Sequence, residues 1–260
     1  MLIIIPILYF ISFILSLYYI YSGKIGSARF SHWLFTSAIG IQILLLINKT
    51  VDFEQRNIEI TLFVASFILS TFALIFIRQN IKNLYCFFIS PVAFILTVPL
   101  VMISNEDGGS SYNNRILIIH VLLNILSHTT LLISSIFSIM FIYQHRNFKN
   151  KKVKKISRMP SLSLIEKINF NLIITSFPLM TIGLVLGFLL SKNQIGTYWF
   201  GTVSALSIFS WLIYFSLIQL RITYNLSGLK VSLISLLGFT SIIIGYIFMY
   251  FLDLPSHTFV

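Results

Sequence analysis

The chain has 260 residues, of which 57% are hydrophobic and only 10% are charged. Because about a quarter of the residues in a soluble globular domain are charged, this composition excludes a soluble fold and indicates that lipid surrounds most of the chain. The net charge of +11 does not indicate a nucleic-acid-binding protein, since no basic face with interleaved aromatic residues occurs outside one loop. In a membrane protein, the same excess of positive charge is explained by Lys and Arg in the cytoplasmic loops.

Eight apolar segments follow one another along the sequence, and each is long enough to cross the bilayer as a helix. They are continuously apolar rather than alternating with a period of two, which favours helices over the strands of a barrel. We therefore predict an all-α fold, a polytopic integral membrane helix bundle that forms a single domain over residues 1–260. The predicted helices are residues 2–21, 30–47, 60–77, 85–103, 116–143, 170–190, 197–220 and 229–252.

The distribution of basic residues predicts the side that each connection faces. Fourteen of the 18 Lys and Arg residues lie in the first, third, fifth and seventh connections, and four lie in the second, fourth and sixth. By the positive-inside rule, the first set faces the cytoplasm. Both termini are then expected on the extracytoplasmic side.

The fifth connection, residues 144–169, holds eight of these basic residues. We expect this cytoplasmic loop to lie against anionic lipid, because each Lys or Arg near such a surface adds about 1 kcal/mol of attraction. An acidic protein partner is the alternative interpretation of the same charge. After Pro160, the spacing of Ser163 and Glu166 is that of a capping box and predicts a short interfacial helix.

Motifs of familiar enzymes are absent from the sequence. No Ser-His-Asp set, HExxH sequence, P-loop or dinucleotide fingerprint occurs. Acidic residues are also missing from the predicted membrane interior, which argues against a proton relay or a carboxylate metal site. The single cysteine, Cys86, excludes an internal disulfide. We therefore expect a protein that is not an enzyme.

Three histidines are candidate metal ligands. His120 lies about one turn from the outer end of the fifth predicted helix, and His257 follows the eighth on the same side. Two imidazoles from different helices can supply both axial ligands of a haem iron. The alternatives are a histidine hydrogen-bonded within the bundle for His120 and a solvated tail residue for His257. His128, about 12 Å deeper on the same helix as His120, is either a further ligand or a core histidine.

The outer junction before the seventh predicted helix is aromatic, with Tyr198 and Trp199 next to each other. One interpretation is the aromatic belt of a membrane interface, and the other is a platform for a porphyrin ring. Arg115 and Lys192 are basic residues near the same face. Their position allows pairing with haem propionates.

Several motifs run through the second half of the chain in a fixed order. They are His120-Val-Leu-Leu-Asn-Ile-Leu-Ser-His128, Met159-Pro-Ser-Leu-Ser-Leu-Ile-Glu-Lys-Ile-Asn-Phe-Asn-Leu-Ile, Phe177-Pro-Leu-Met-Thr-Ile-Gly-Leu-Val-Leu-Gly187, Gly196-Thr-Tyr-Trp199, Trp211-Leu-Ile-Tyr214, Arg221, Gly228 and Gly238-Phe239. In order and spacing, these motifs resemble the HemX/CcsA-like family of cytochrome c assembly proteins. The resemblance covers about residues 60–257 and is most specific from His120 onward.

The resemblance implies a protein of the bacterial cytoplasmic (inner) membrane that handles haem at the outer face, together with other cytochrome c assembly proteins. Members of the family hold haem with two outer histidines that flank a tryptophan-rich motif; His120 matches the first histidine, His257 the second and Trp199 one tryptophan. After the aromatic cluster, the family continues with Trp-Asp-Pro-Lys, whereas this chain has Gly201-Thr-Val-Ser-Ala205. With this departure, the chain resembles the small HemX- or YpjD-like branch of the family.

Two other functions stay open at this point. A membrane scaffold or regulator would keep the fold without binding haem, and would act through helix contacts or the basic loop. A small-molecule transporter is the third hypothesis, because Pro91, Pro99 and Pro178 interrupt predicted helices as in broken transporter helices. The lack of a clear internal repeat and of intramembrane carboxylates counts against transport.

Overall fold

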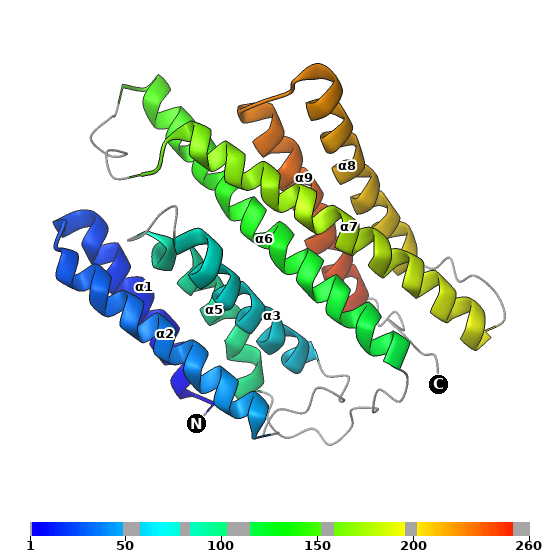
Figure 1. Cartoon of the computed structure of the whole chain (residues 1–260), viewed down its shortest axis with the longest axis horizontal. Helices are drawn as coiled ribbons and strands as arrows, with labels where there is room; N and C mark the ends of the chain where they lie inside the picture. Colours follow the sequence, from blue (N-terminus) through cyan, green and yellow to red (C-terminus); the bar gives the residue numbers. More distant parts are fainter. Residues whose placement is uncertain are drawn as a thin grey trace. The chain divides into compact units, whose positions relative to one another are not determined.

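The computed structural model describes residues 2–48, 58–78, 84–102, 115–151, 159–195 and 202–251. These residues form eight α-helices and no strand, which confirms the predicted all-α membrane bundle (Figure 1). Within them, five helices are long and apolar enough to span a membrane, and three shorter apolar helices accompany them. The helices are α1 (Ile4–Ser22), α2 (Ile25–Ile47), α3 (Ile58–Phe72), α5 (Tyr85–Met102), α6 (Arg115–Lys149), α7 (Leu162–Ile195), α8 (Thr202–Tyr224) and α9 (Leu229–Phe251), with a π-helical turn at Ala73–Ile77 that continues α3.

The chain divides into two compact units, residues 1–113 and residues 114–260. The first unit contains α1 to α5 and the second contains α6 to α9. The single domain over residues 1–260 and the extracytoplasmic termini stay predictions.

α6 and α7 extend furthest beyond the segments that the sequence predicted. α6 continues six residues beyond its apolar segment to Lys149, because no Gly or Pro interrupts the polar stretch from Gln144 onward. α7 begins at Leu162, and Ser161 accepts a hydrogen bond from the backbone N–H of Leu164 at its first turn (3.3 Å). The predicted interfacial helix after Pro160 is therefore the start of α7, and its cap is Ser161 rather than Ser163.

The proline residues expected to break helices lie inside continuous ones. Pro91 and Pro99 are within α5, and Pro178 is within α7. Each proline removes one backbone N–H donor, yet the helix continues on both sides. The feature that suggested broken transporter helices is therefore not seen in the described residues.

Buried polar side chains connect the helices of the first unit. The Tyr9 hydroxyl of α1 donates to Oε1 of Gln42 on α2 (2.8 Å), and the Gln42 amide donates to Ser66 on α3 (2.8 Å). The Ser12 hydroxyl lies 3.0 Å from that of Ser31 and 3.1 Å from that of Ser90, which joins α1 to α2 and α5. An unpaired polar group surrounded by lipid costs several kcal/mol, so these pairs fix how the helices pack.

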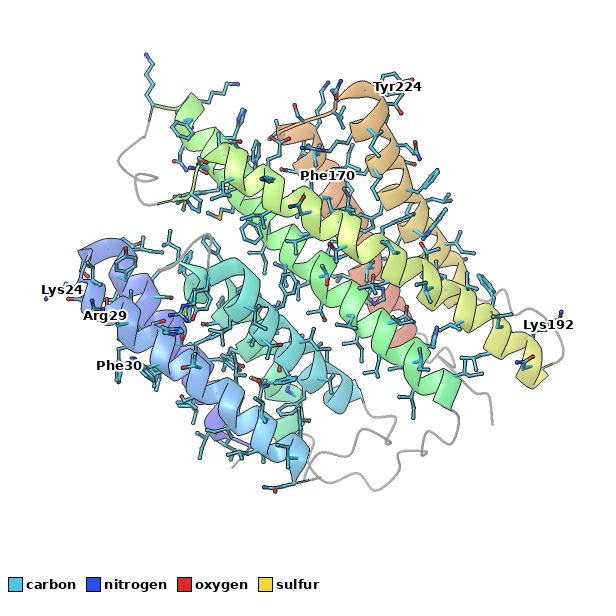
Figure 2. All side chains as sticks on the ribbon, viewed as in Figure 1. Lys24, Arg29, Phe30, Phe170, Lys192 and Tyr224 are labelled. Carbon is cyan, nitrogen blue, oxygen red and sulfur yellow. The ribbon has the colours of Figure 1, made fainter. Side chains whose placement is uncertain are left out.

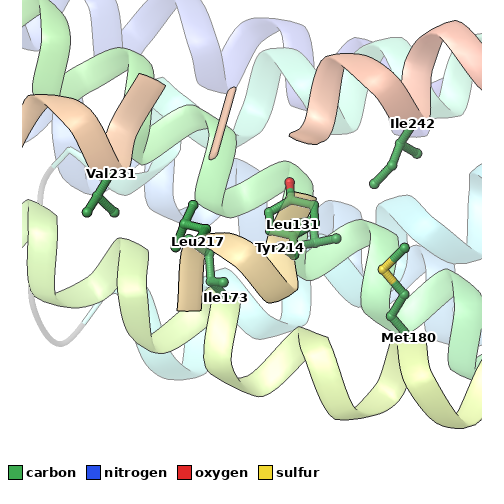
Figure 3. Packing of buried hydrophobic residues seen from close by; sticks show 7 residues of the cluster. All are labelled: Leu131, Ile173, Met180, Tyr214, Leu217, Val231 and Ile242. Atoms are coloured by element: carbon green, nitrogen blue, oxygen red, sulfur yellow. The ribbon is translucent and has the colours of Figure 1, made fainter. Parts of the chain in front are cut away.

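The second unit is organised around the antiparallel pair of α6 and α7, which lie side by side in Figure 1. Hydrogen bonds follow the pair from end to end: Ser127 donates to the carbonyl of Ser176 (3.1 Å), and the Gln144 amide donates to the carbonyl of Pro160 (2.9 Å). Between them, Asn169 bonds both Ser134 and Ser138. An apolar cluster joins the pair to α8 and α9 (Figure 3); it consists of Leu131, Ile173, Met180, Tyr214, Leu217, Val231 and Ile242.

An ion pair fixes α7 to α8 at the end of the unit near the basic loop. Arg221 contacts Glu166 at 2.6 Å, donates to the carbonyl of Leu226 at 3.2 Å, and lies 4.3 Å from the centre of the Phe170 ring. Both charged side chains are partly buried, at 22% and 18% exposure. Because water screens the pair incompletely, it holds this end of α7 in place.

Candidate functional site

His120 lies in the second turn of α6, at the end remote from the basic loop, and only 8% of its surface is exposed. At 1.5 Å per residue, about 43 Å of helix separate His120 from Lys149. The hydrocarbon core of a bilayer is about 30 Å thick. The helix is therefore long enough to place His120 and the basic end of α6 at opposite faces of a membrane.

The His120 ring packs into a notch on α7 that two glycines create. A Cβ atom built on Gly187 would lie 2.8 Å from Cε1 of His120, and one built on Gly183 would lie 2.4 Å from Oδ1 of Asn124. Residues four apart share one face of a helix, so His120 and Asn124 of α6 face Gly183 and Gly187 of α7. Small residues at this spacing let two membrane helices approach closely. Here the space receives polar side chains.

The hydrogen bond of His120 defines its tautomer. Nδ1 lies 2.8 Å from the carbonyl oxygen of Gly183, and because a carbonyl only accepts, Nδ1 carries the proton. In the neutral ring, the lone pair is then on Nε2. Metal-ligating histidines commonly have this arrangement, in which one ring nitrogen donates to a carbonyl while the other binds the metal.

Haem iron requires only one or two axial ligands from the protein. A histidine whose Nδ1–H is already bound to a backbone carbonyl fits one such position, so the donor chemistry of His120 is compatible with haem. Asn124 lies beside the ring, with its Nδ2 3.1 Å from Nε2 and 3.4 Å from Nδ1.

Two predicted basic residues lie at the same end of the second unit as His120. Arg115 is the first residue of α6. Lys192 is exposed in the last turn of α7, close to the end of the helix in Figure 2. α8 begins and α9 ends at this end as well (Figure 1).

His128 is half-buried and does not share the face of His120. Eight residues along a helix correspond to a rotation of about 80° beyond two full turns, so the two rings leave α6 in different directions. The predicted site residues Tyr198, Trp199 and His257 lie outside the described residues.

Sequence reasoning gave no role to Asn124, Gly183 or Gly187. The available signal was the pair of four-residue spacings, His120 to Asn124 and Gly183 to Gly187. Nothing local in the sequence shows that these pairs face each other, because the His120 hydrogen bond joins residues 63 positions apart.

Comparisons with known proteins identify a family and several relatives. The family described as cytochrome C assembly protein matches residues 1–255. Protein HemX of Bacillus subtilis is 24% identical over 247 residues, which cover 92% of this chain and 87% of HemX. The cytochrome c biogenesis protein CcsA of Guillardia theta is 24% identical over 253 residues, covering 85% of this chain and 84% of that protein. No solved structure matches the chain.

The close packing at the glycine notch predicts that a larger residue there lowers the stability of the protein. Gly187→Ala places a methyl group against the His120 ring, and we expect it to lower the free energy of unfolding by about 1–3 kcal/mol, as overpacking does. Gly40→Ala is the matched control, because a Cβ at Gly40 of α2 meets nothing within 4 Å. Alanine favours a helix over glycine by about 1 kcal/mol, so the control should be no less stable than the wild type.

The measurement is thermal unfolding of the purified proteins in mild detergent. Equal melting temperatures for the two variants would contradict the close packing of His120 against α7.

Proposed function

Because this chain belongs to the cytochrome c assembly protein family, we propose that it serves cytochrome c biogenesis by binding haem at the outer face of the bacterial cytoplasmic membrane. The observation that carries the proposal is His120 itself: its ring is buried in the glycine notch, and its Nδ1 is bonded to the Gly183 carbonyl at 2.8 Å. Nε2 is then the iron-ligating atom. His257 supplies the opposite axial ligand in this proposal.

The orientation rests on charge. Fourteen of the 18 basic residues lie in the first, third, fifth and seventh connections along the sequence, which the positive-inside rule makes cytoplasmic. His120 is at the end of α6 remote from the fifth connection, so haem bound there faces the compartment in which haem is attached to c-type cytochromes.

The remaining contacts to haem involve the ends of the helices around His120. Arg115 and Lys192 pair with the propionates, and their positions at the ends of α6 and α7 support this assignment. Tyr198 and Trp199, which lie outside the described residues, are assigned to the porphyrin wall in this proposal. Haem is held and presented, so the chain forms no covalent bond and is not an enzyme; other assembly proteins carry out the attachment.

The visible absorption spectrum of the purified protein tests this function. We expect a Soret band with about one haem per chain, and a loss of at least about tenfold in bound haem for His120→Ala and for His257→Ala, because each removes an axial ligand. His145→Ala is the control; His145 stacks on Phe141, at 6.1 Å between ring centres, near the basic end of α6.

A colourless wild-type protein that also fails to take up added haem would contradict haem binding and favour the membrane scaffold. An unchanged band in His120→Ala would remove His120 from the site.

The basic end of the second unit is a proposed contact with anionic lipid. Arg146, Lys149, Lys151, Lys167 and Lys230 are exposed there. In the described part of α6 to α9, the acidic residue is Glu166, and Arg221 neutralises it. The exposed charges therefore form a single-sign field that attracts lipid phosphates.

Native mass spectrometry after reconstitution in an equal mixture of phosphatidylglycerol and phosphatidylcholine measures this contact. We expect the triple variant Lys149→Gln, Lys151→Gln, Lys167→Gln to retain less phosphatidylglycerol than the wild type, and the corresponding Arg variant, which keeps the charge, to retain as much. Equal retention in the Gln variant would contradict the lipid contact.

A further inference from the structure

We propose that Asn124 is a positioning residue of the haem site, which fixes the ring plane and the tautomer of His120 before iron arrives. The inference rests on the proposed haem-binding function. It adds to that function the residue that prevents the His120 ring from turning while no haem is bound.

The two distances from the Asn124 amide locate it relative to the ring. Its Nδ2 is 3.1 Å from Nε2 and 3.4 Å from Nδ1 of His120. An atom on the in-plane lone-pair axis of Nε2 would be much farther from Nδ1, because Nδ1 is on the opposite side of the ring. An in-plane atom equally close to both nitrogens would collide with Cε1. The amide nitrogen therefore lies over the face of the imidazole, where an N–H can point at the π electrons.

The in-plane lone pair of Nε2 consequently does not point at Asn124. Nδ1 donates in the plane of the ring to Gly183, and the amide covers one face, so the two contacts act along perpendicular directions. Together they resist rotation about the bond between Cβ and Cγ, since a half-turn would exchange Nδ1 with Cδ2 and Nε2 with Cε1 and so take Nδ1 away from the Gly183 carbonyl.

α7 holds the amide in turn. A Cβ on Gly183 would lie 2.4 Å from Oδ1 and 3.1 Å from Cγ of Asn124, so the amide fills the space that this glycine leaves. With its oxygen against the α7 backbone, the amide presents its nitrogen to the ring. Gly183 thus supports the site twice, through its carbonyl to His120 and through its missing side chain to Asn124.

Such a ligand is preorganised. A ring held by its own packing and by hydrogen bonds loses less freedom when it binds iron, which favours affinity and a single ligand orientation. Without the amide, the ring can turn about the bond between Cβ and Cγ, Nδ1 then loses the Gly183 carbonyl, and the proton is no longer confined to Nδ1.

Two variants separate this role from packing. Asn124→Leu keeps the approximate shape of the side chain and removes its N–H donors. The double variant Asn124→Ala, Gly183→Ala places a methyl group in the space that the amide vacates, so it restores contact without the donor. Asn171→Leu is the control, because Asn171 is an exposed asparagine on α7.

The first measurement uses the haem-free protein: ¹⁵N NMR of the histidine ring nitrogens, with the His120 signals assigned by their loss in His120→Ala. We expect one Nδ1–H tautomer in the wild type and in Asn171→Leu, and a mixture of tautomers in both Asn124 variants. A single wild-type tautomer in both Asn124 variants would overturn the proposal.

The second measurement uses the haem-loaded protein: the haem dissociation constant and the electron paramagnetic resonance spectrum of the ferric state, which reports the orientation of the axial imidazole planes. We expect about tenfold weaker haem binding in both Asn124 variants, equivalent to about 1.4 kcal/mol, and broadened resonances. Unchanged affinity and resonances in both would overturn the proposal. If the wild type takes up no haem, the proposed function fails, and the haem-free NMR measurement still decides whether Asn124 positions His120.

Discussion

The close approach of α6 to α7 at Gly183 and Gly187 is the constraint on which the rest of the second unit depends. Any side chain at Gly187 would meet the His120 ring, and any at Gly183 would meet the Asn124 amide. The absence of two Cβ atoms therefore brings an imidazole into contact with a backbone carbonyl in a bilayer, where such groups have no water as an alternative partner. The same approach explains why His120 is both buried and hydrogen-bonded.

α7 is held by polar contacts of different kinds near its start and about two thirds of the way along. Near the start of the helix, Glu166 pairs with Arg221 of α8; further along, the carbonyl of Gly183 accepts a hydrogen bond from His120 of α6. About 26 Å of helix separate Glu166 from Gly183 at 1.5 Å per residue, which is close to the thickness of the hydrocarbon core. The apolar residues between these contacts pack against α6, α8 and α9. α7 is thus the element that links the Glu166–Arg221 ion pair to His120.

The helices could be predicted from the sequence because long, continuously apolar segments have few alternatives in lipid. The ends of α6 and α7 could not be predicted. A polar stretch without Gly or Pro can either continue the helix beyond the membrane or form a loop, and the sequence does not distinguish the two. His120 could be selected as a candidate from the sequence because an ionisable side chain is conspicuous in an apolar segment, and the structure shows that it is buried. Asn124, Gly183 and Gly187 were missed because their role exists only when α6 and α7 face each other. The partners expected of His120, namely Tyr198, Trp199 and His257, lie outside the described residues.

Chemical rescue of a cavity tests most directly whether His120 ligates haem. In His120→Gly, the side chain is replaced by a space that free imidazole can enter. If His120 is an axial ligand, the variant should lack the low-spin haem spectrum of the wild type and regain it on addition of imidazole, whereas the wild-type spectrum should not change. A His120→Gly protein that shows the wild-type spectrum without imidazole would contradict a haem site built on His120.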